Sequence, residues 1–273
     1  MSSILDGIYR IIDQFFEVTH IGTRAPHYAN KAACLTLSDN PPDGLNGFEL
    51  VERIFRRIEA NWDNSPRRGK PPSKENWRHE PSTKKEAKRL EVRLERAIVK
   101  LEEEAWANQV PTSSGLMGAH LDKTRNIDLV RDCDNGRYKF VELKVNSNTP
   151  LFAAMEILGY GLIYLFSRLY RNPSDKKMLD AKSIHLKVLA PYEYYYYITK
   201  TPVRHDEKYQ LAWLEDLIND GLGTFLDGFG VSMDFKFEAF PPDFPCRRTD
   251  IFPDIDKAKL RAALKSIQPV YPR

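Results

Sequence analysis

The sequence of 273 residues has few cysteines, no long hydrophobic run and little net charge. The three cysteines, Cys34, Cys133 and Cys246, lie far apart without CxxC spacing, so we expect reduced structural thiols and no zinc site. No apolar segment approaches the roughly 20 residues of a membrane span, and the start has no signal-peptide pattern. We therefore expect a cytoplasmic protein that does not act on membranes.

The small net charge of +3 does not by itself argue for nucleic-acid binding, but the charge is unevenly distributed. Residues 53–100 hold fifteen Lys or Arg against seven acids, a net charge of +8. One interpretation is the solvated face of a helix followed by a polar linker. The other is a surface that follows a nucleic-acid backbone, with these candidate contacts: Arg67, Arg68, Lys84, Lys85 and Lys88.

The first part of the chain has the apolar spacing of helices. Apolar residues recur at helical intervals over 4–18 and 48–61. The polar segment 63–81 is interrupted by four prolines, which predicts a linker or mobile loop. We therefore expect a helical N-terminal region over 1–81 and a separate domain over 82–273.

The remaining sequence predicts an α/β domain. Strands are expected near 116–120 and over 126–145, 183–190 and 231–240, and helices over 84–106, 151–171, 205–220 and 256–266. The helix at 151–171 is apolar on most sides and should lie in the core, where Glu156 needs a partner. Glycines at 221, 223, 228 and 230 should end the helix at 205–220, and no Gly-Lys-Ser/Thr follows them to form a phosphate loop.

Five tyrosines, Tyr192 and Tyr194 to Tyr197, follow the strand at 183–190. Tyrosine rings can stack on nucleic-acid bases. Tyrosine is also a common strand and interface residue, which favours packing as the role of this run.

The segment 126–145 has the pattern of a β-hairpin that carries charges among core residues. Asp134-Asn135-Gly136 supplies the turn, because Asn and Gly accept positive φ at low cost. Glu142 and Lys144, two residues apart in the second strand, point to one face, within reach of Asp128 on the first strand. Two acids and a lysine on one face are the residue types of a divalent-metal site with a base or charge stabiliser beside it.

The spacing acid-x-Lys is a weak signal alone, since it occurs six times in this sequence. Two occurrences fall in strand-like segments, Asp234 to Lys236 and Glu142 to Lys144, and only the second follows an acid-bearing strand and precedes a long apolar helix. Cross-strand ion pairing on a sheet face is the alternative explanation. Apolar residues on both hairpin faces indicate a buried sheet, where unpaired acids are costly, and favour a functional site.

Asp128, the turn, Glu142-Leu143-Lys144 and the following helix together resemble the PD-(D/E)XK nuclease superfamily. The resemblance covers residues 84–190 and implies a restriction-endonuclease-like core, a mixed central sheet flanked by helices in the order αβββαβ. In this chain the core would carry a helical N-terminal extension. One branch of the family has Gln-x-x-x-Tyr in the helix after the motif, and the matching positions here are Glu156 and Tyr160.

The resemblance also implies roles for individual residues. Asp128 and Glu142 would be ligands of Mg²⁺, which Mn²⁺ can replace, and the main-chain carbonyl of Leu143 would be a further oxygen ligand. Lys144 would position or deprotonate the attacking water. In some branches the first helix donates a glutamate, which falls here to Glu91 or Glu95.

The sequence thus predicts a metal-dependent nuclease that hydrolyses phosphodiester bonds, with DNA preferred over RNA. Endonucleases that cut both strands are often two-fold dimers, so a homodimer is one possible assembly. The alternative is a catalytically inactive nucleic-acid-binding or assembly protein on the same fold. A third reading is an interaction module that uses the tyrosine run as its interface.

Overall fold

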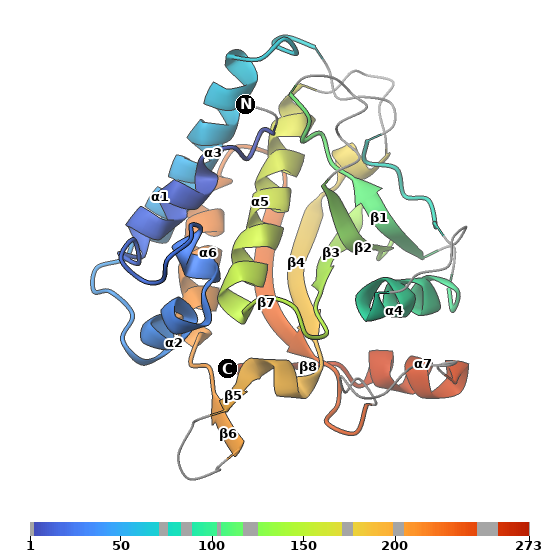
Figure 1. Cartoon of the computed structure of the whole chain (residues 1–273). Coiled ribbons are helices and arrows are strands. Elements are labelled where there is room, and N and C mark those ends of the chain that lie inside the picture. Colours follow the sequence, from blue (N-terminus) through green and yellow to red (C-terminus); the bar gives the residue numbers. More distant parts are fainter. Residues whose placement is uncertain are drawn as a thin grey trace.

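The computed structural model describes residues 3–70, 76–82, 89–102, 105–116, 125–170, 177–198, 205–244 and 256–272. At its centre is a mixed six-stranded sheet in the order β1-β2-β3-β4-β7-β8 (Figure 1). Strands β1 to β3 are antiparallel neighbours, β4 and β7 run parallel to β3, and β8 is antiparallel to β7. The bounds are β1 Trp106–Pro111, β2 Asn126–Asp132, β3 Arg137–Leu143, β4 Ser183–Ala190, β7 Ser232–Ala239 and β8 Gln268–Pro269. The α/β class predicted from the sequence is confirmed.

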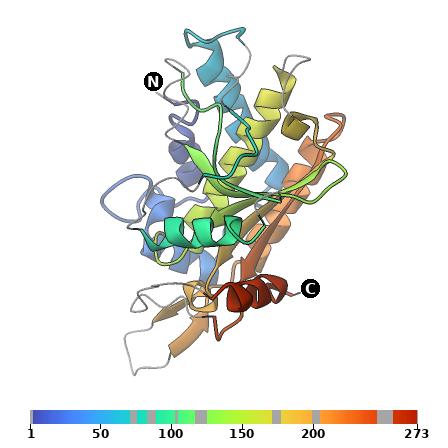
Figure 2. The same cartoon turned by 90° about the vertical axis from the view of Figure 1, so that its right-hand side faces the viewer.

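Helices cover both faces of this sheet. One face carries α1 (Ile8–Phe15), α3 (Gly47–Asp63), α5 (Pro150–Leu169) and α6 (Ala212–Phe225). The other carries α4 (Leu90–Val99) and α7 (Lys257–Lys265), which lie in front of the sheet in Figure 2. The smaller elements are η1 His27–Ala29, α2 Lys31–Asp39, η3 Lys177–Asp180, η4 Tyr192–Tyr195, β5 Tyr196–Ile198 and β6 His205–Lys208.

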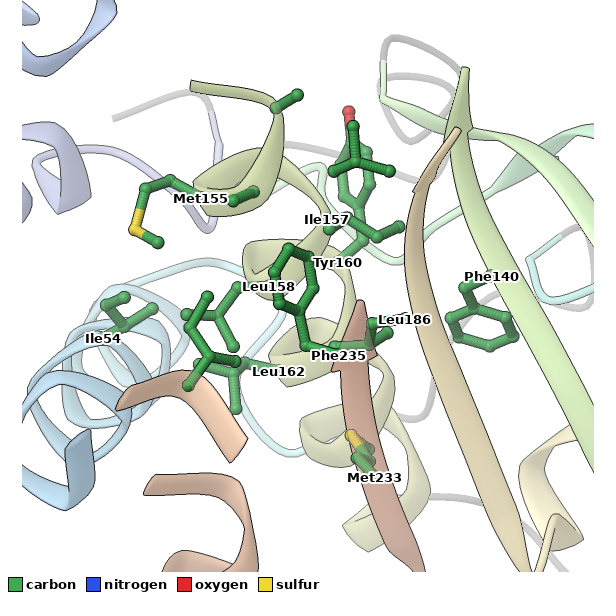
Figure 3. Packing of buried hydrophobic residues seen from close by; sticks show 14 of the residues in the cluster. Ile54, Phe140, Met155, Ile157, Leu158, Tyr160, Leu162, Leu186, Met233 and Phe235 are labelled. Carbon is green, nitrogen blue, oxygen red and sulfur yellow. The ribbon is translucent and has the colours of Figure 1, made fainter. Parts of the chain in front are cut away.

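Helix α5 is the centre of the larger hydrophobic core. Thr149 caps its start, accepting a hydrogen bond from the Phe152 N–H at 3.2 Å, and Pro150 occupies the first turn, where no N–H partner is needed. Figure 3 shows its apolar side chains between α3 on one side and the sheet on the other. Contrary to the expectation from the sequence, one helix among the described residues, α5, is long and apolar enough to cross a membrane, and 89% of its apolar window is buried inside the protein. Such burial fits the core helix of a soluble protein.

The N-terminal helices share this core, so residues on both sides of the predicted boundary pack together. Trp77, within the segment predicted as a linker, is fully buried, stacks on Phe140 of β3 and meets the edge of Tyr164 of α5. The main-chain N–H of Trp77 donates to the Pro111 carbonyl at 2.9 Å. This part of the segment is therefore an ordered layer over the sheet, while residues 71–75 lie outside the described part.

Two predicted helices begin or end at other residues in the structure. The helix expected over 84–106 ends in the structure at Val99, and β1 begins at Trp106. Pairing with β2 satisfies the backbone of β1, and this tertiary partner is invisible in the local sequence. The strand expected at 116–120 lies outside the described residues from 117 onward.

The helix expected over 205–220 was also misplaced. Residues 205–208 form β6, and α6 runs from Ala212 to Phe225, through Gly221 rather than ending there. A Cβ atom on Gly221 would lie 2.2 Å from the carbonyl oxygen of Gly47 in α3. Gly221 is therefore needed for the close approach of two helices, which outweighs its low helix propensity.

Candidate functional site

The predicted hairpin forms and aligns three polar side chains across the sheet. Leu129 pairs with Val141, so Asp128 lies opposite Glu142 on the face that carries α5. The turn residues Asp134, Asn135 and Gly136 all have positive φ, as their residue types predicted. The motif residues thus converge because antiparallel pairing places one acid from each strand side by side.

Lys144, directly after β3, is bound by two carboxylates. Its Nζ donates to Glu142 Oε1 at 2.5 Å and to Glu156 Oε2 of α5 at 3.0 Å. Tyr160, one turn further along α5, donates its hydroxyl to Glu156 Oε1 at 3.5 Å. Glu142 is 3% and Lys144 6% exposed. Glu156, which is partly buried and was expected to need a partner, therefore finds one in Lys144.

Asp128 is held by the backbone of the neighbouring strand. Its Oδ2 accepts the Leu143 N–H at 3.0 Å, and its Oδ1 accepts the side-chain amide of Gln109 at 3.4 Å. The same Gln109 Nε2 donates to Glu95 Oε2 of α4 at 2.8 Å. Helix α4 thus contributes one carboxylate, which is 1% exposed, to the edge of the cluster.

Of the two glutamates considered on this helix, the structure brings Glu95 to Asp128. Glu91 is directed elsewhere: its Oε1 accepts the Val145 N–H at 3.1 Å and the Ser147 hydroxyl at 2.6 Å. Those bonds hold the loop between β3 and α5. Glu91 therefore supports the loop that follows the motif and makes no direct bond to the other site residues in the described part of the chain.

The excess of carboxylates shifts the protonation equilibria of the site. Burial and the neighbouring Asp128 raise the pKa of Glu95 to about 8. Burial raises the pKa of Asp128 to about 6, although Lys144 and the Leu143 N–H lower it. Burial and the carboxylates of Asp128 and Glu156 raise the pKa of Glu142 well above its usual value. The cluster therefore disfavours its own full ionisation.

The same carboxylates favour the charged form of Lys144. Burial lowers the pKa of Lys144, but Glu142, Glu156 and Asp128 raise it by more, so that it lies above its usual value. As the site stands, Lys144 is an ammonium donor that offsets part of the carboxylate charge.

The donor set fits a hard divalent cation. Carboxylate and carbonyl oxygens are the ligands that Mg²⁺ takes, and the predicted set is Asp128, Glu142 and the Leu143 carbonyl. Glu142 Oε2 is buried and accepts no hydrogen bond from an N–H or hydroxyl donor among the described residues, and the carboxyl groups of Glu142 and Asp128 lie within hydrogen-bonding reach of each other when one is protonated. Within the same residues no three Asp, Glu, His or Cys side chains are grouped closely enough to hold a metal ion as they stand. Lys144 bridges the acids instead.

The five proposed nucleic-acid contacts have three different outcomes in the structure. Arg67 is buried: its Nη1 donates to the Gly115 carbonyl at 2.8 Å and its guanidinium lies 5.2 Å from the centre of the Trp62 ring. It therefore joins two segments of the chain and does not present its charge to a ligand. Arg68 is exposed. Three positions lie outside the described residues: Lys84, Lys85 and Lys88.

The tyrosine run is divided between core and surface. Tyr195 is fully buried and donates to the carbonyls of Val188 and Glu238, so its role is packing. Tyr192 is 38% exposed, and its ring lies 4.8 Å from that of Tyr196. Packing is thus confirmed for Tyr195.

Sequence reasoning missed Gln109. The register of β1 and β2 places it directly opposite Asp128, between the pairs Asn108–Leu129 and Val110–Ile127. The missed strand β1 explains the omission, because a residue assigned to a loop gives no cross-strand neighbour.

Comparison of this chain with protein-family models, with curated proteins and with solved structures gave no match.

Proposed function

We propose that this protein is a Mg²⁺-dependent nuclease of the PD-(D/E)XK type that hydrolyses phosphodiester bonds, with DNA as the preferred substrate. The observation that carries the proposal is the convergence of Asp128, Glu142 and Lys144 on one sheet face, where the carboxyl groups of Asp128 and Glu142 lie within hydrogen-bonding reach of each other. A purely structural ion pair would not be expected to bring a second buried acid against the first, because two neighbouring carboxyl groups disfavour each other's ionisation.

The order of elements supports the same proposal. Helix α4, the antiparallel strands β1, β2 and β3, helix α5 and the parallel strand β4 follow one another as αβββαβ. This is the order that the resemblance implies for the nuclease core. A shared fold supports a function only together with the residues of its site, so the order counts as supporting and not as carrying the proposal.

In this proposal each residue of the site has a separate role. Asp128 and Glu142 would hold Mg²⁺, together with the Leu143 carbonyl, and the Leu143 N–H fixes the Asp128 carboxylate for that purpose. When bound, Mg²⁺ supplies positive charge that activates water and offsets the charge developing on phosphorus. Lys144 donates from Nζ to two carboxylates, which favours charge stabilisation over proton abstraction as its role.

The proposal is tested by incubating the protein with plasmid, linear and single-stranded DNA in Mg²⁺ or Mn²⁺. Asp128→Ala and Lys144→Ala are each expected to abolish cleavage. The matched controls are Asp234→Ala and Lys236→Ala, which remove the other strand-borne acid-x-Lys pair. Cleavage that survives Asp128→Ala unchanged would contradict the proposal.

A second candidate is a nucleic-acid-binding or assembly protein on the same fold without catalysis. The ion pairs from Lys144 to Glu142 and Glu156 favour it, since they neutralise part of the cluster without a metal. It predicts salt-sensitive DNA binding that does not change with Mg²⁺ or EDTA, and no cleavage of any substrate. An RNA substrate in the same assay separates the DNA preference from nuclease activity as such.

A further inference from the structure

Helix α7 presents positive charge without negative charge. Over Lys257–Lys265 it contains four Lys or Arg and no acid. All four are exposed, and none forms an ion pair with another described residue: Lys257, Lys259, Arg261 and Lys265. Asp256 precedes the helix, and its Oδ1 accepts the main-chain N–H groups of Ala258 at 2.7 Å and Lys259 at 3.4 Å. Its charge is thus directed to the start of the helix, and the exposed side of α7 is cationic.

The arginines of α3 differ from the cations of α7 because they are paired. Arg53 pairs with Glu49, four residues before it. Arg56 pairs with Glu52 at 3.7 Å and with Glu59 at 3.1 Å. Opposite charges three or four residues apart neutralise each other along a helix surface. Because α7 has no such acids, its charge remains available to a partner outside the helix.

The spacing of the α7 cations is unfavourable for the helix alone. Lys257, Arg261 and Lys265 follow one another at intervals of four residues, and like charges at this spacing repel each other. A partner with several regularly spaced negative charges would offset this repulsion. The phosphodiester backbone of nucleic acid is such a partner, and Lys and Arg are the residues that neutralise its phosphates.

Helix α7 lies close to the candidate site. Leu260 and Ala263 are buried in the same hydrophobic cluster as Leu143 and Val145, the residues on either side of Lys144. Figures 1 and 2 show α7 at the end of the sheet where β3 and β4 end. A nucleic acid bound along α7 would therefore lie beside the strand end that carries the acid-x-Lys residues.

The composition of α7 favours a nucleic-acid backbone over a membrane surface as its partner. An amphipathic helix that binds a membrane inserts its apolar side into the lipid. The apolar side of α7 is already buried in the protein, since Leu260 is 1% and Ala263 5% exposed. The helix has no aromatic residue, so it offers charge to phosphates and no ring on which a base could stack.

We propose that Lys257, Lys259, Arg261 and Lys265 form a docking surface for the phosphate backbone of duplex DNA, which holds the substrate beside the candidate site. The inference rests on the proposed function for the identity of the substrate. It places DNA contacts on α7, outside the segment 53–100 whose charge suggested such contacts in the sequence.

The test measures binding of a labelled DNA duplex by fluorescence anisotropy in EDTA, which prevents metal-dependent cleavage, between about 50 and 200 mM salt. Lys259→Gln combined with Arg261→Gln removes two cations of α7. Arg53→Gln combined with Arg56→Gln, at exposed positions of α3, is the matched control with the same change in net charge. The α7 variant is expected to bind at least about tenfold more weakly, with a salt dependence reduced by about two phosphate contacts, while the control binds like wild type.

The other outcomes separate this inference from the proposed function. Equal weakening in both variants would overturn the inference, because net charge alone would then explain the loss. Vesicle binding that depends on α7, measured with phosphatidylcholine and phosphatidylserine, would also overturn it if DNA binding is unchanged. Cleavage of the same duplex in Mg²⁺ is recorded separately. DNA that is bound through α7 and never cleaved would contradict the nuclease proposal alone, and cleavage with unchanged DNA binding in the α7 variant would overturn the docking surface alone.

Discussion

Two charged clusters lie on opposite faces of the same sheet, and they differ in charge balance. The cluster facing α5 holds three carboxylates around one lysine, Lys144: Asp128, Glu142 and Glu156, with Gln109 linking Asp128 to Glu95 of α4 at the sheet edge. The cluster on the other face joins Lys187 of β4 to Asp234 and Glu238 of β7, and His185 Nδ1 lies 2.5 Å from Asp234 Oδ2. Both contain a buried lysine that bridges two acids.

The pKa shifts of the acids show what this difference means. Burial raises the pKa of Asp234, but His185 and Lys187 lower it by more, so it lies below its usual value. The pKa values of Glu142 and Asp128 are raised, because burial and repulsion between carboxylates raise them by more than the single lysine lowers them. The β4–β7 cluster is therefore a self-sufficient ion-pair network. The cluster facing α5 lacks positive charge, and a divalent cation would supply it.

The largest expected difference between the clusters is in catalysis. Lys144→Met is expected to lower the rate of Mg²⁺-dependent DNA cleavage by roughly 10²–10⁴-fold, because it removes the cation nearest to the reacting group. Lys187→Met, which removes an equally buried bridging lysine, should leave the rate per folded molecule unchanged. Initial rates on linear DNA measure both. Equal loss in the two variants would show that folding, and not chemistry, is affected.

The next largest effect is a dependence of stability on pH. The folded pKa of Glu95 is raised to about 8, so its stabilising contribution is complete below about pH 4.5 and is lost as the pH rises through 8. Glu95→Gln removes that loss and should stabilise the metal-free protein at pH 8 by on the order of a few kcal/mol. The gain should shrink toward zero near pH 4.5. Urea unfolding across this range measures it, and a gain independent of pH would contradict the assignment.

Added metal should stabilise the protein through the cluster facing α5 and not through the β4–β7 cluster. Mn²⁺ at 100 times its dissociation constant should stabilise the wild-type protein by about 2.7 kcal/mol, because it binds the folded state alone. Asp128→Asn should abolish this shift in unfolding temperature, and Asp234→Asn should retain it. EDTA should reverse the stabilisation. An equal Mn²⁺ shift in Asp128→Asn would place the ion elsewhere.

The smallest effect concerns the stability of the metal-free protein at pH 8, which should change in opposite directions when one acid of each cluster is replaced. Glu142→Gln replaces an acid whose pKa is raised by burial and should stabilise the fold at this pH, because Lys144 keeps its bond to Glu156. Asp234→Asn removes an acid whose pKa is lowered and should destabilise it by about 0.5 kcal/mol after solvent screening, since its side chain is 47% exposed. The second effect should disappear at low pH, as Asp234 protonates. Chemical unfolding measures both, and shifts of the same sign would remove the distinction between the clusters.

Local patterns predicted the elements nearest to the candidate site. The strand over 183–190 matches β4 residue for residue, and the turn of the hairpin lies where Asp134-Asn135-Gly136 predicted it. These succeed because strand alternation and turn chemistry are local properties. The strand β1 and the continuation of α6 past Gly221 were missed, because pairing with β2 and contact with Gly47 decide them. Gln109 was missed for the same reason.

The sequence by itself determined that Glu142 and Lys144 share a face and that Asp128 precedes them on a partner strand, since side-chain alternation fixes both. Only the tertiary structure decided which glutamate of α4 reaches Asp128, that Glu156 binds Lys144, and that Arg67 is buried. The physical reason is the range of the interactions. Alternation within a strand follows from backbone geometry over two residues, whereas the choice of an ion-pair partner depends on how helices from distant parts of the chain pack on the sheet.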